Sequence, residues 1–457
     1  MGVIRWLGKR LMTTLFRELH VIDRDNIPDD RGAVLVSWHP CAMYDQILTQ
    51  TSLNLDLIDF DGLIDSEEEL ESIAKAVANG GKVMVFPEGE THDSPQSVEV
   101  RDCASKILLR SREIADLEPV LVPIGIHYSE RYRFRERVAI TVERPAIVPD
   151  EIEVEDLSEL ISKEISRASQ SRSTWQERRL IWNVRSIVHA ERVRRNPDLE
   201  LRTTFDVGVL QARRVRAAWE WLSQNDSEKC LQLEEETKSH LKKLKDIGLK
   251  PRHLDARPNM IGMKGLLKSV WWTLFAWSFM LGFVTWSAII GSIPPYLVVK
   301  STDKFFAEKL SVSEIGQKKY HIALIIYPIW WLISALGFTW VLIGDASPLH
   351  VFEKYSLTLA FLFSLPSYVV FPLMLWWMPT AGKLQIKLYT RGTIAWRRLK
   401  LWVIWRNPKF DWDRLISTQN KIAEKLTNIG NSLILPGDAD WVDPDLGLED
   451  WTRVFER

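Results

Sequence analysis

The chain has 457 residues, a length that predicts two or three domains. Its 59 basic and 60 acidic side chains give a net charge of −1, so no overall positive field points to nucleic acid as a partner. The three cysteines, Cys41, Cys103 and Cys230, have neither metal-site spacing nor the pattern of a disulfide framework. These features predict no metal site. They favour a protein in a reducing compartment, or one in which the cysteine thiols have no functional role.

Residues 1–20 lack the short apolar core and the cleavage site of a signal peptide. Apolar residues, Trp6 among them, recur at helical spacing and are accompanied by four cations. This pattern is typical of a basic amphipathic helix that lies on a membrane surface, which we predict here. The alternative is a first core helix of the domain that follows.

Residues 21–150 alternate between short apolar runs and helical patterns. Ser66 is a suitable N-cap for one of the helices, and the Gly80-Gly81 pair ends it. The alternation predicts an α/β domain with a mostly parallel sheet covered by helices. Strands are predicted over Ala33–Ser37, Lys82–Phe86, Val120–Ile126 and Arg137–Val142, and helices over Ser66–Asn79 and Arg101–Arg112.

Residues 151–265 are charged and helical in pattern, and we interpret their charged blocks as solvated helix faces. The composition then changes, because three long stretches carry no charged side chain. Each exceeds the roughly 20 residues that a membrane-spanning helix needs. They predict an α-helical membrane-embedded region at 266–382, with segments at about 269–299, 320–344 and 355–382.

Lysines and arginines flank the second and third apolar segments, which predicts a hairpin with both ends in the cytosol. The first segment either crosses the membrane by itself over 269–290, or enters the membrane and returns to the same side. Lysines after it also indicate the cytosol, so we expect it to turn at Pro294-Pro295. The α/β domain then faces the cytosol, from a bacterial inner membrane or the endoplasmic reticulum. The polar tail, 383–457, is expected to pack as helices at the interface.

A His and an Asp follow the first predicted strand of the domain. His39 comes two residues after that strand, Pro40 stiffens the turn, and Asp45 follows. The carboxyl ends of parallel strands are where α/β folds place their chemistry. An imidazole can take a proton from a hydroxyl, and a carboxylate at its other nitrogen stabilises the imidazolium that forms. This pair is the candidate catalytic dyad.

A second motif, Phe-Pro-Glu-Gly-Glu-Thr-His-Asp, covers residues 86–93 at the end of the next strand. Its glycine lets a backbone approach a ligand closely, and Glu88 beside Thr91 could hold a hydroxylated substrate. An ordinary Pro/Gly turn is the alternative. A third strand ends in Val-Pro-Ile-Gly at 122–125, and four arginines follow at 131–137. Guanidinium groups match phosphate oxygens, although these could form only a solvated face.

Together the three motifs resemble the glycerolipid acyltransferase family. The form Phe-Pro-Glu-Gly-x-Ser/Thr-His-Asp-x-Pro at 86–95, with five residues between His39 and Asp45, is similar to its glycerol-3-phosphate/dihydroxyacetone-phosphate acyltransferase branch. Arg101 stands where that family more often has Lys. The resemblance implies that His39 is the general base and that Asp45 orients it. It assigns acceptor binding to Phe86, Pro87, Glu88, Gly89, Thr91 and His92, with Arg135 or Arg137 for phosphate.

The resemblance implies transfer of a fatty acyl group from a thioester to glycerol-3-phosphate or dihydroxyacetone phosphate in phospholipid biosynthesis. Acyl-CoA or acyl carrier protein is then a co-substrate, the bilayer is a partner, and no cofactor is needed. Cys41 is expected to be a small buried residue rather than a nucleophile. Two alternatives stay open: acylation of a lysophospholipid, lysophosphatidate above all, or a catalytically silent lipid-binding scaffold.

Overall fold

A computed structural model of the chain divides into two compact units, which are described separately. Unit 1 comprises residues 1–255, 311–317 and 413–457, and unit 2 comprises 256–310 and 318–412. The residues that the structure describes are 16–39, 43–58, 60, 64, 66–89, 92–96, 98–129, 136–171, 174–196, 198–200, 203–255, 258–280, 283–306, 312–343, 361, 364–407, 411–435 and 454–456.

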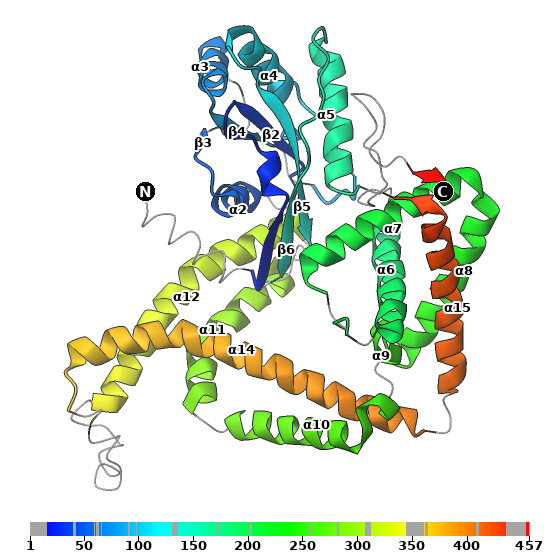
Figure 1. Cartoon of the computed structure of the whole chain (residues 1–457). Coiled ribbons are helices and arrows are strands. Elements are labelled where there is room, and N and C mark those ends of the chain that lie inside the picture. Colours follow the sequence, from blue (N-terminus) through cyan, green and yellow to red (C-terminus); the bar gives the residue numbers. More distant parts are fainter. Residues whose placement is uncertain are drawn as a thin grey trace. The chain divides into compact units, whose positions relative to one another are not determined.

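Unit 1 contains a six-stranded sheet with the order β1-β6-β5-β2-β4-β3 (Figure 1). Neighbouring strands are parallel except for the antiparallel pair β5–β6, so the mostly parallel sheet predicted from the sequence is confirmed. The strands are β1 (Glu18–Ile22), β2 (Ala33–Ser37), β3 (Leu57–Ile58), β4 (Lys82–Val85), β5 (Val120–Tyr128) and β6 (Arg137–Val142).

Strand β2 lies in the middle of this sheet, between β5 and β4. All five of its residues are buried, which explains its continuous apolar run, since a central parallel strand is covered on both faces. The residues that follow it therefore emerge at the carboxyl edge of the sheet, beside the end of β4. This arrangement brings the first two sequence motifs together.

Four helices cover the sheet: α2 (Met43–Leu53), α3 (Glu67–Ala78), α4 (Cys103–Ile114) and α5 (Val154–Ala168). The side chain of Ser66 accepts a hydrogen bond from the Glu69 amide at 3.2 Å, so the predicted N-cap is confirmed. Helices α3 and α4 lie side by side (Figure 1). The α4 helix begins and ends two residues later than predicted.

The helix predicted over residues 1–20 is wrong at its end, because Glu18–His20 belong to β1. This strand pairs in parallel with β6, from Glu18 opposite Arg137 to Ile22 opposite Thr141. Pairing with a distant strand overrides a helical pattern in so short a segment. Residues 1–15 of that prediction lie outside the described residues.

The helical extension predicted after residue 150 is present as α6 (Trp175–Arg195), α7 (Phe205–Asn225), α8 (Ser227–Asp246) and α9 (Pro251–Asp255). The predicted tail contains a helix of its own. Helix α15 (Trp412–Asn431) packs into unit 1, where Ile422 joins Ile187, Leu222 and Leu233 in one apolar cluster. A small hairpin, β7 (Leu433–Ile434) with β8 (Phe455–Glu456), follows.

Unit 2 consists of long helices: α10 (Pro258–Met280), α11 (Phe283–Phe306), α12 (Val312–Ile343, from residue 318 on) and α14 (Ser367–Trp405). Both α10 and α11 lie along α14 (Figure 1). Helix α14 runs through residue 383, so the predicted membrane region and the predicted tail share one helix. Among the described residues one segment, His321–Ile343, is long and apolar enough to cross a membrane by length and composition.

The chain does not turn at Pro294-Pro295, contrary to the sequence prediction, because both prolines lie inside α11. Pro294 has no N–H to donate to the carbonyl of Ile290, four residues earlier. The indole Nε1 of Trp330, on α12, donates to that carbonyl at 2.6 Å. The helix can continue because this bond replaces the missing one.

Candidate active site

The predicted dyad forms at the carboxyl edge of the sheet. His39 lies two residues after the end of β2, and Asp45 lies in the first turn of α2. Imidazole Nδ1 of His39 lies 3.2 Å from Oδ2 of Asp45, whose carboxylate is completely buried, whereas the imidazole is 17% exposed. With Nδ1 facing the carboxylate, Nε2 is the nitrogen that can face a substrate hydroxyl. This is the relation that a general base and its orienting carboxylate require.

Tyr128, the last residue of β5, completes the support of Asp45. Its phenolic OH donates to Oδ1 of Asp45 at 2.6 Å, so each carboxylate oxygen has its own contact. Tyr128 is not among the site residues predicted from the sequence. A tyrosine at the end of the strand beside β2 was the available signal, but only the strand order shows that it meets Asp45.

Glu88 joins the two motifs. Its carboxylate is completely buried and accepts hydrogen bonds from the amides of His39 at 2.8 Å and Val98 at 3.0 Å. Nε2 of His92 lies 3.1 Å from the oxygen that also binds His39. The structure thus gives Glu88 a positioning part, and its contact with substrate stays a prediction. It fixes the backbone at His39 and brings His92 next to it.

The rest of the second motif shapes the turn around the dyad. The ring of Phe86 packs against His39, with 4.5 Å between ring centroids. The carbonyl of Pro87 accepts from the amide of Arg101 at 2.8 Å. Gly89 has a φ of +72°, and a Cβ there would stand 2.4 Å from Cζ of Arg101. Glycine therefore suits the positive φ at this turn, and any larger residue would have to displace this guanidinium.

Arg101 is a candidate site residue that the prediction missed. Its side chain is exposed and lies across the turn at Gly89, two residues before α4. The sequence contained a signal, because Arg101 is a cation that follows the second motif, just before the predicted helix. Thr91 and Arg135, which were predicted to bind substrate, lie outside the described residues.

Arg137 is not brought to the dyad. Its neighbour Val138 pairs with Tyr128 in the antiparallel β5–β6 ladder, so these two side chains share the face on which Asp45 lies. Arg137 consequently points to the opposite face. There its guanidinium lies 5.0 Å from the ring centroid of Phe205, on α7.

An aromatic clamp from α6 holds the loop after the second motif. The guanidinium of Arg178 lies 5.1 Å from the ring centroids of both Trp38 and Trp175 and donates to the carbonyl of Pro95. Nε1 of Trp175 donates to the carbonyl of Asp93 at 2.9 Å. Trp38 is buried and donates to the carbonyl of Ile126, so the clamp is anchored in the sheet. These contacts fix the loop that carries His92.

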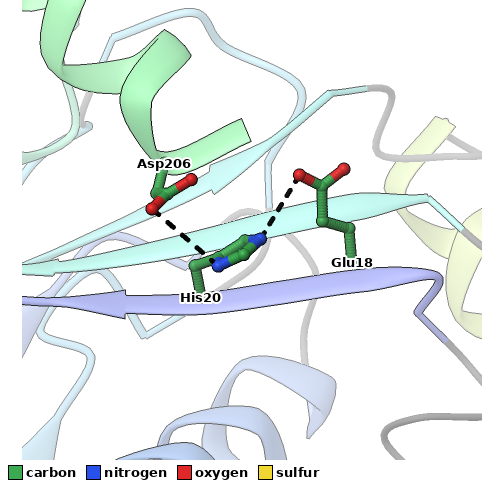
Figure 2. A group of neighbouring side chains, drawn as sticks. All are labelled: Glu18, His20 and Asp206. Atoms are coloured by element: carbon green, nitrogen blue, oxygen red, sulfur yellow. Dashed lines mark hydrogen bonds and ion pairs between the residues drawn. The ribbon is translucent and has the colours of Figure 1, made fainter. Parts of the chain in front are cut away.

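In the described part of the chain, Glu18, His20 and Asp206 form a group whose possible metal ligands lie within 4.8 Å of one another (Figure 2). Glu18 lies 3.3 Å from Nε2 of His20, and Asp206 lies 3.9 Å from Nδ1. The carboxylates thus face opposite nitrogens of one ring, whereas a shared ion would need both at one nitrogen. Glu18 also accepts from the amide of Phe205, so we interpret the group as a contact that joins β1 to α7.

The fold and site define an α/β protein with a His–Asp pair at the carboxyl edge of its sheet. No family model matches the sequence. Over 229 residues it is 24% identical to glycerol-3-phosphate O-acyltransferase 2 of Saccharomyces cerevisiae, a match that covers 49% of this chain and 30% of the yeast protein. The chain is thus similar to a glycerolipid acyltransferase, in line with the resemblance of its motifs.

The solved structure of the 1-acyl-sn-glycerophosphate (LPA) acyltransferase PlsC from Thermotoga maritima is also similar to this chain. The sequence identity is 18% and the TM-score is 0.31, over 37% of this chain and 78% of the Thermotoga chain.

Proposed function

We propose that the protein transfers a fatty acyl group from an acyl thioester to the hydroxyl of a small phosphate-bearing acceptor, with glycerol-3-phosphate as the first choice and dihydroxyacetone phosphate as a close variant. The single observation that carries this proposal is the His39–Asp45 pair at the carboxyl edge of the sheet, 3.2 Å apart and next to the second motif. The relationship to a yeast glycerol-3-phosphate acyltransferase supports the same acceptor.

The chemistry requires one base and no covalent enzyme intermediate. Nε2 of His39 takes the hydroxyl proton while the acceptor oxygen attacks the thioester carbonyl, and Asp45 stabilises the resulting imidazolium. The tetrahedral intermediate then collapses, the carbon–sulfur bond breaks, and the proton passes from His39 to the leaving thiolate. The products are an ester and a free thiol, so no cofactor is consumed.

Arg101 is the phosphate ligand that we favour. Its guanidinium is exposed, carries a fixed positive charge and lies at Gly89, on the turn that also positions His39. A guanidinium can bind two phosphate oxygens at once, which would orient the acceptor hydroxyl toward the base. Arg135 remains a candidate for the same part from the sequence pattern.

Membrane attachment through unit 2 is part of the proposal. Large apolar side chains are exposed along α10, α11, α12 and α14; Trp271 is 67% exposed and Tyr368 is 78% exposed. Apolar surface of this extent is uncommon on soluble monomers, and aromatic residues favour membrane interfaces. A bilayer would cover these helices and retain both the acyl chain and the product. Unit 1 would then face the cytosol.

An acceptor panel tests the proposal. Full-length protein in lipid nanodiscs is given radiolabelled palmitoyl-CoA with glycerol-3-phosphate, dihydroxyacetone phosphate or lysophosphatidate, and the labelled lipids are separated. We expect the largest kcat/KM with glycerol-3-phosphate. Preference for lysophosphatidate would replace this acceptor by the lysophospholipid alternative, and no transfer to any acceptor, with acyl-CoA or acyl carrier protein as donor, would favour the silent scaffold.

A further inference from the structure

Four helices of unit 1 enclose a cavity that the proposed chemistry does not use. It lies among α6, α7, α8 and α15 and has a volume of about 360 Å³. This volume is within the range of pockets that hold small ligands. Its apolar wall is built from side chains of all four helices, among them Val184, Val188, Leu222, Leu233, Leu426 and Ile429.

One side of this cavity is cationic. Arg185, Arg192 and Arg214 line it together with His189, and no acidic side chain is among the residues that line it. Arg192 is exposed, and within the described part of the chain its guanidinium makes no ion pair. A cavity with an apolar wall and an arginine edge is complementary to a molecule that has an apolar chain and an anionic head.

Arg185 is held in place by neutral groups. Its Nη1 donates to Oγ1 of Thr203 at 2.9 Å and to Oε1 of Gln211 at 3.4 Å, and its guanidinium lies 5.1 Å from the ring centroid of Trp182. Its Nε is buried and has no hydrogen-bond partner within the described residues. The side chain is therefore fixed in position while its charge is not neutralised by a carboxylate there.

The surroundings of Arg185 destabilise its positive charge. Burial, together with the nearby Arg137 and Arg252, lowers the pKa of Arg185 to about 10. A desolvated cation among other cations is stabilised when an anion binds next to it. Gly208 allows the arrangement, because a Cβ there would lie 2.9 Å from Nη1 of Arg185. The cavity thus has a preformed place for a negative group.

We propose that this cavity binds a single-chain amphiphile with an anionic head, a phosphate or a carboxylate. The chain lies among the apolar residues, and the head contacts Arg185 and Arg192. The site is separate from the dyad: the Trp175 end of α6 holds the loop at Asp93, whereas Arg192 lies about 25 Å farther along the same helix, at about 1.5 Å per residue. The inference does not depend on the proposed acyl transfer.

Photolabelling tests the site in the full-length protein in phosphatidylcholine nanodiscs. The probe is a dodecyl phosphate that carries a diazirine near the end of its chain, and the labelled peptides are identified by mass spectrometry. We expect labelling within α6, α7 and α15 that excess dodecyl phosphate prevents. Dodecyl maltoside has the same chain without charge, and inorganic phosphate has the charge without a chain, so neither should compete.

Two arginine variants test the contact with the head. Arg185→Gln should weaken labelling about tenfold, the usual effect of removing a hydrogen bond to a charged group. Since that variant also loses packing, the exposed Arg192→Gln serves as the second and should weaken labelling about two- to fivefold. Arg179→Gln is the matched control, because Arg179 is exposed on the same helix but does not line the cavity.

Ala218→Trp should abolish labelling by filling the cavity, because Ala218 lines it. His39→Ala should leave labelling unchanged even if acyl transfer is lost, which separates this site from the dyad. The inference is overturned if dodecyl maltoside or inorganic phosphate competes as well as dodecyl phosphate. It is also overturned if labelling is absent from these helices, or if Arg192→Gln and Arg179→Gln both label like the wild type.

Discussion

Tyr128 donates a 2.6 Å hydrogen bond to the carboxylate of Asp45, which in turn faces the imidazole of His39. A chain of three side chains from β5, α2 and the end of β2 therefore reaches the atom that would take the proton. The hydrogen bond of Tyr128 is to the carboxylate of Asp45. It is a positioning residue, because it holds the carboxylate that holds the base.

Tyr128→Phe should lower kcat about tenfold and leave KM for the acceptor nearly unchanged. The change removes the donor to a buried charged oxygen, a loss worth about 1–3 kcal/mol, without altering the surface that meets substrate. Steady-state kinetics measure both constants, with the exposed Tyr389→Phe as a control. A rise in KM at constant kcat would show that Tyr128 binds substrate instead.

Glu88→Gln should destabilise unit 1 by about 2–4 kcal/mol and also impair activity. Both carboxylate oxygens accept backbone amides, of His39 and Val98, and an amide side chain offers only one acceptor. Its NH₂ group would face one of these donors. Urea unfolding checks the free energy, with Glu68→Gln on the exposed start of α3 as the control. Unchanged stability would contradict the structural part given to Glu88.

Gly89→Ala and Gly80→Ala form a matched pair. Both glycines have positive φ, of +72° and +90°, so each alanine should cost about 1 kcal/mol of stability. A Cβ at Gly80 meets nothing within 4 Å, whereas one at Gly89 displaces the guanidinium of Arg101. Only Gly89→Ala should therefore raise KM for the phosphate acceptor, as Arg101→Gln also should. Equal KM values in the two alanine variants would remove Arg101 from the site.

The stability of unit 1 should fall as the pH drops below about 6.5, in part because of His127. Burial, reinforced by Arg178, Arg213 and Arg216, holds the pKa of His127 well below 6.5. The unfolded chain then binds a proton that the folded chain does not, and this favours unfolding at low pH. The slope from this residue is at most about 1.4 kcal/mol per pH unit.

Replacing His127 by Gln should flatten that dependence. The free energy of unfolding is measured by urea denaturation at several pH values between 5 and 7. This range extends from near neutrality to below the ordinary pKa of a histidine, about 6.5. A wild-type slope in His127→Gln would assign the pH dependence to other groups.

The meeting of the two motifs was predictable from the sequence. His39 and Glu88 each follow a short, buried apolar strand, and such strands are parallel neighbours whose carboxyl ends meet. The N-cap at Ser66 was predictable for the same kind of reason, since it depends on residues three positions apart. Features of this kind depend only on residues that are close together in the sequence, so the sequence alone can predict them.

Features that depend on distant partners were not predictable. Tyr128 reaches Asp45 only through the strand order, and β1 is a strand only because β6 lies beside it. The proline pair of α11 predicts a turn from sequence alone. In the structure the helix continues, because Trp330 donates a hydrogen bond to the carbonyl of Ile290. In each case a contact between residues far apart in sequence decides the outcome.

The rate of acyl transfer by His39→Ala tests the central claim most directly. Full-length wild type and variant are compared in nanodiscs with palmitoyl-CoA and the preferred acceptor, after urea unfolding has shown equal stability. Removing a general base should lower kcat by about 10²–10⁴-fold while binding of the acceptor persists. Equal rates in the two proteins would contradict the account, because the proton would then leave the acceptor without His39.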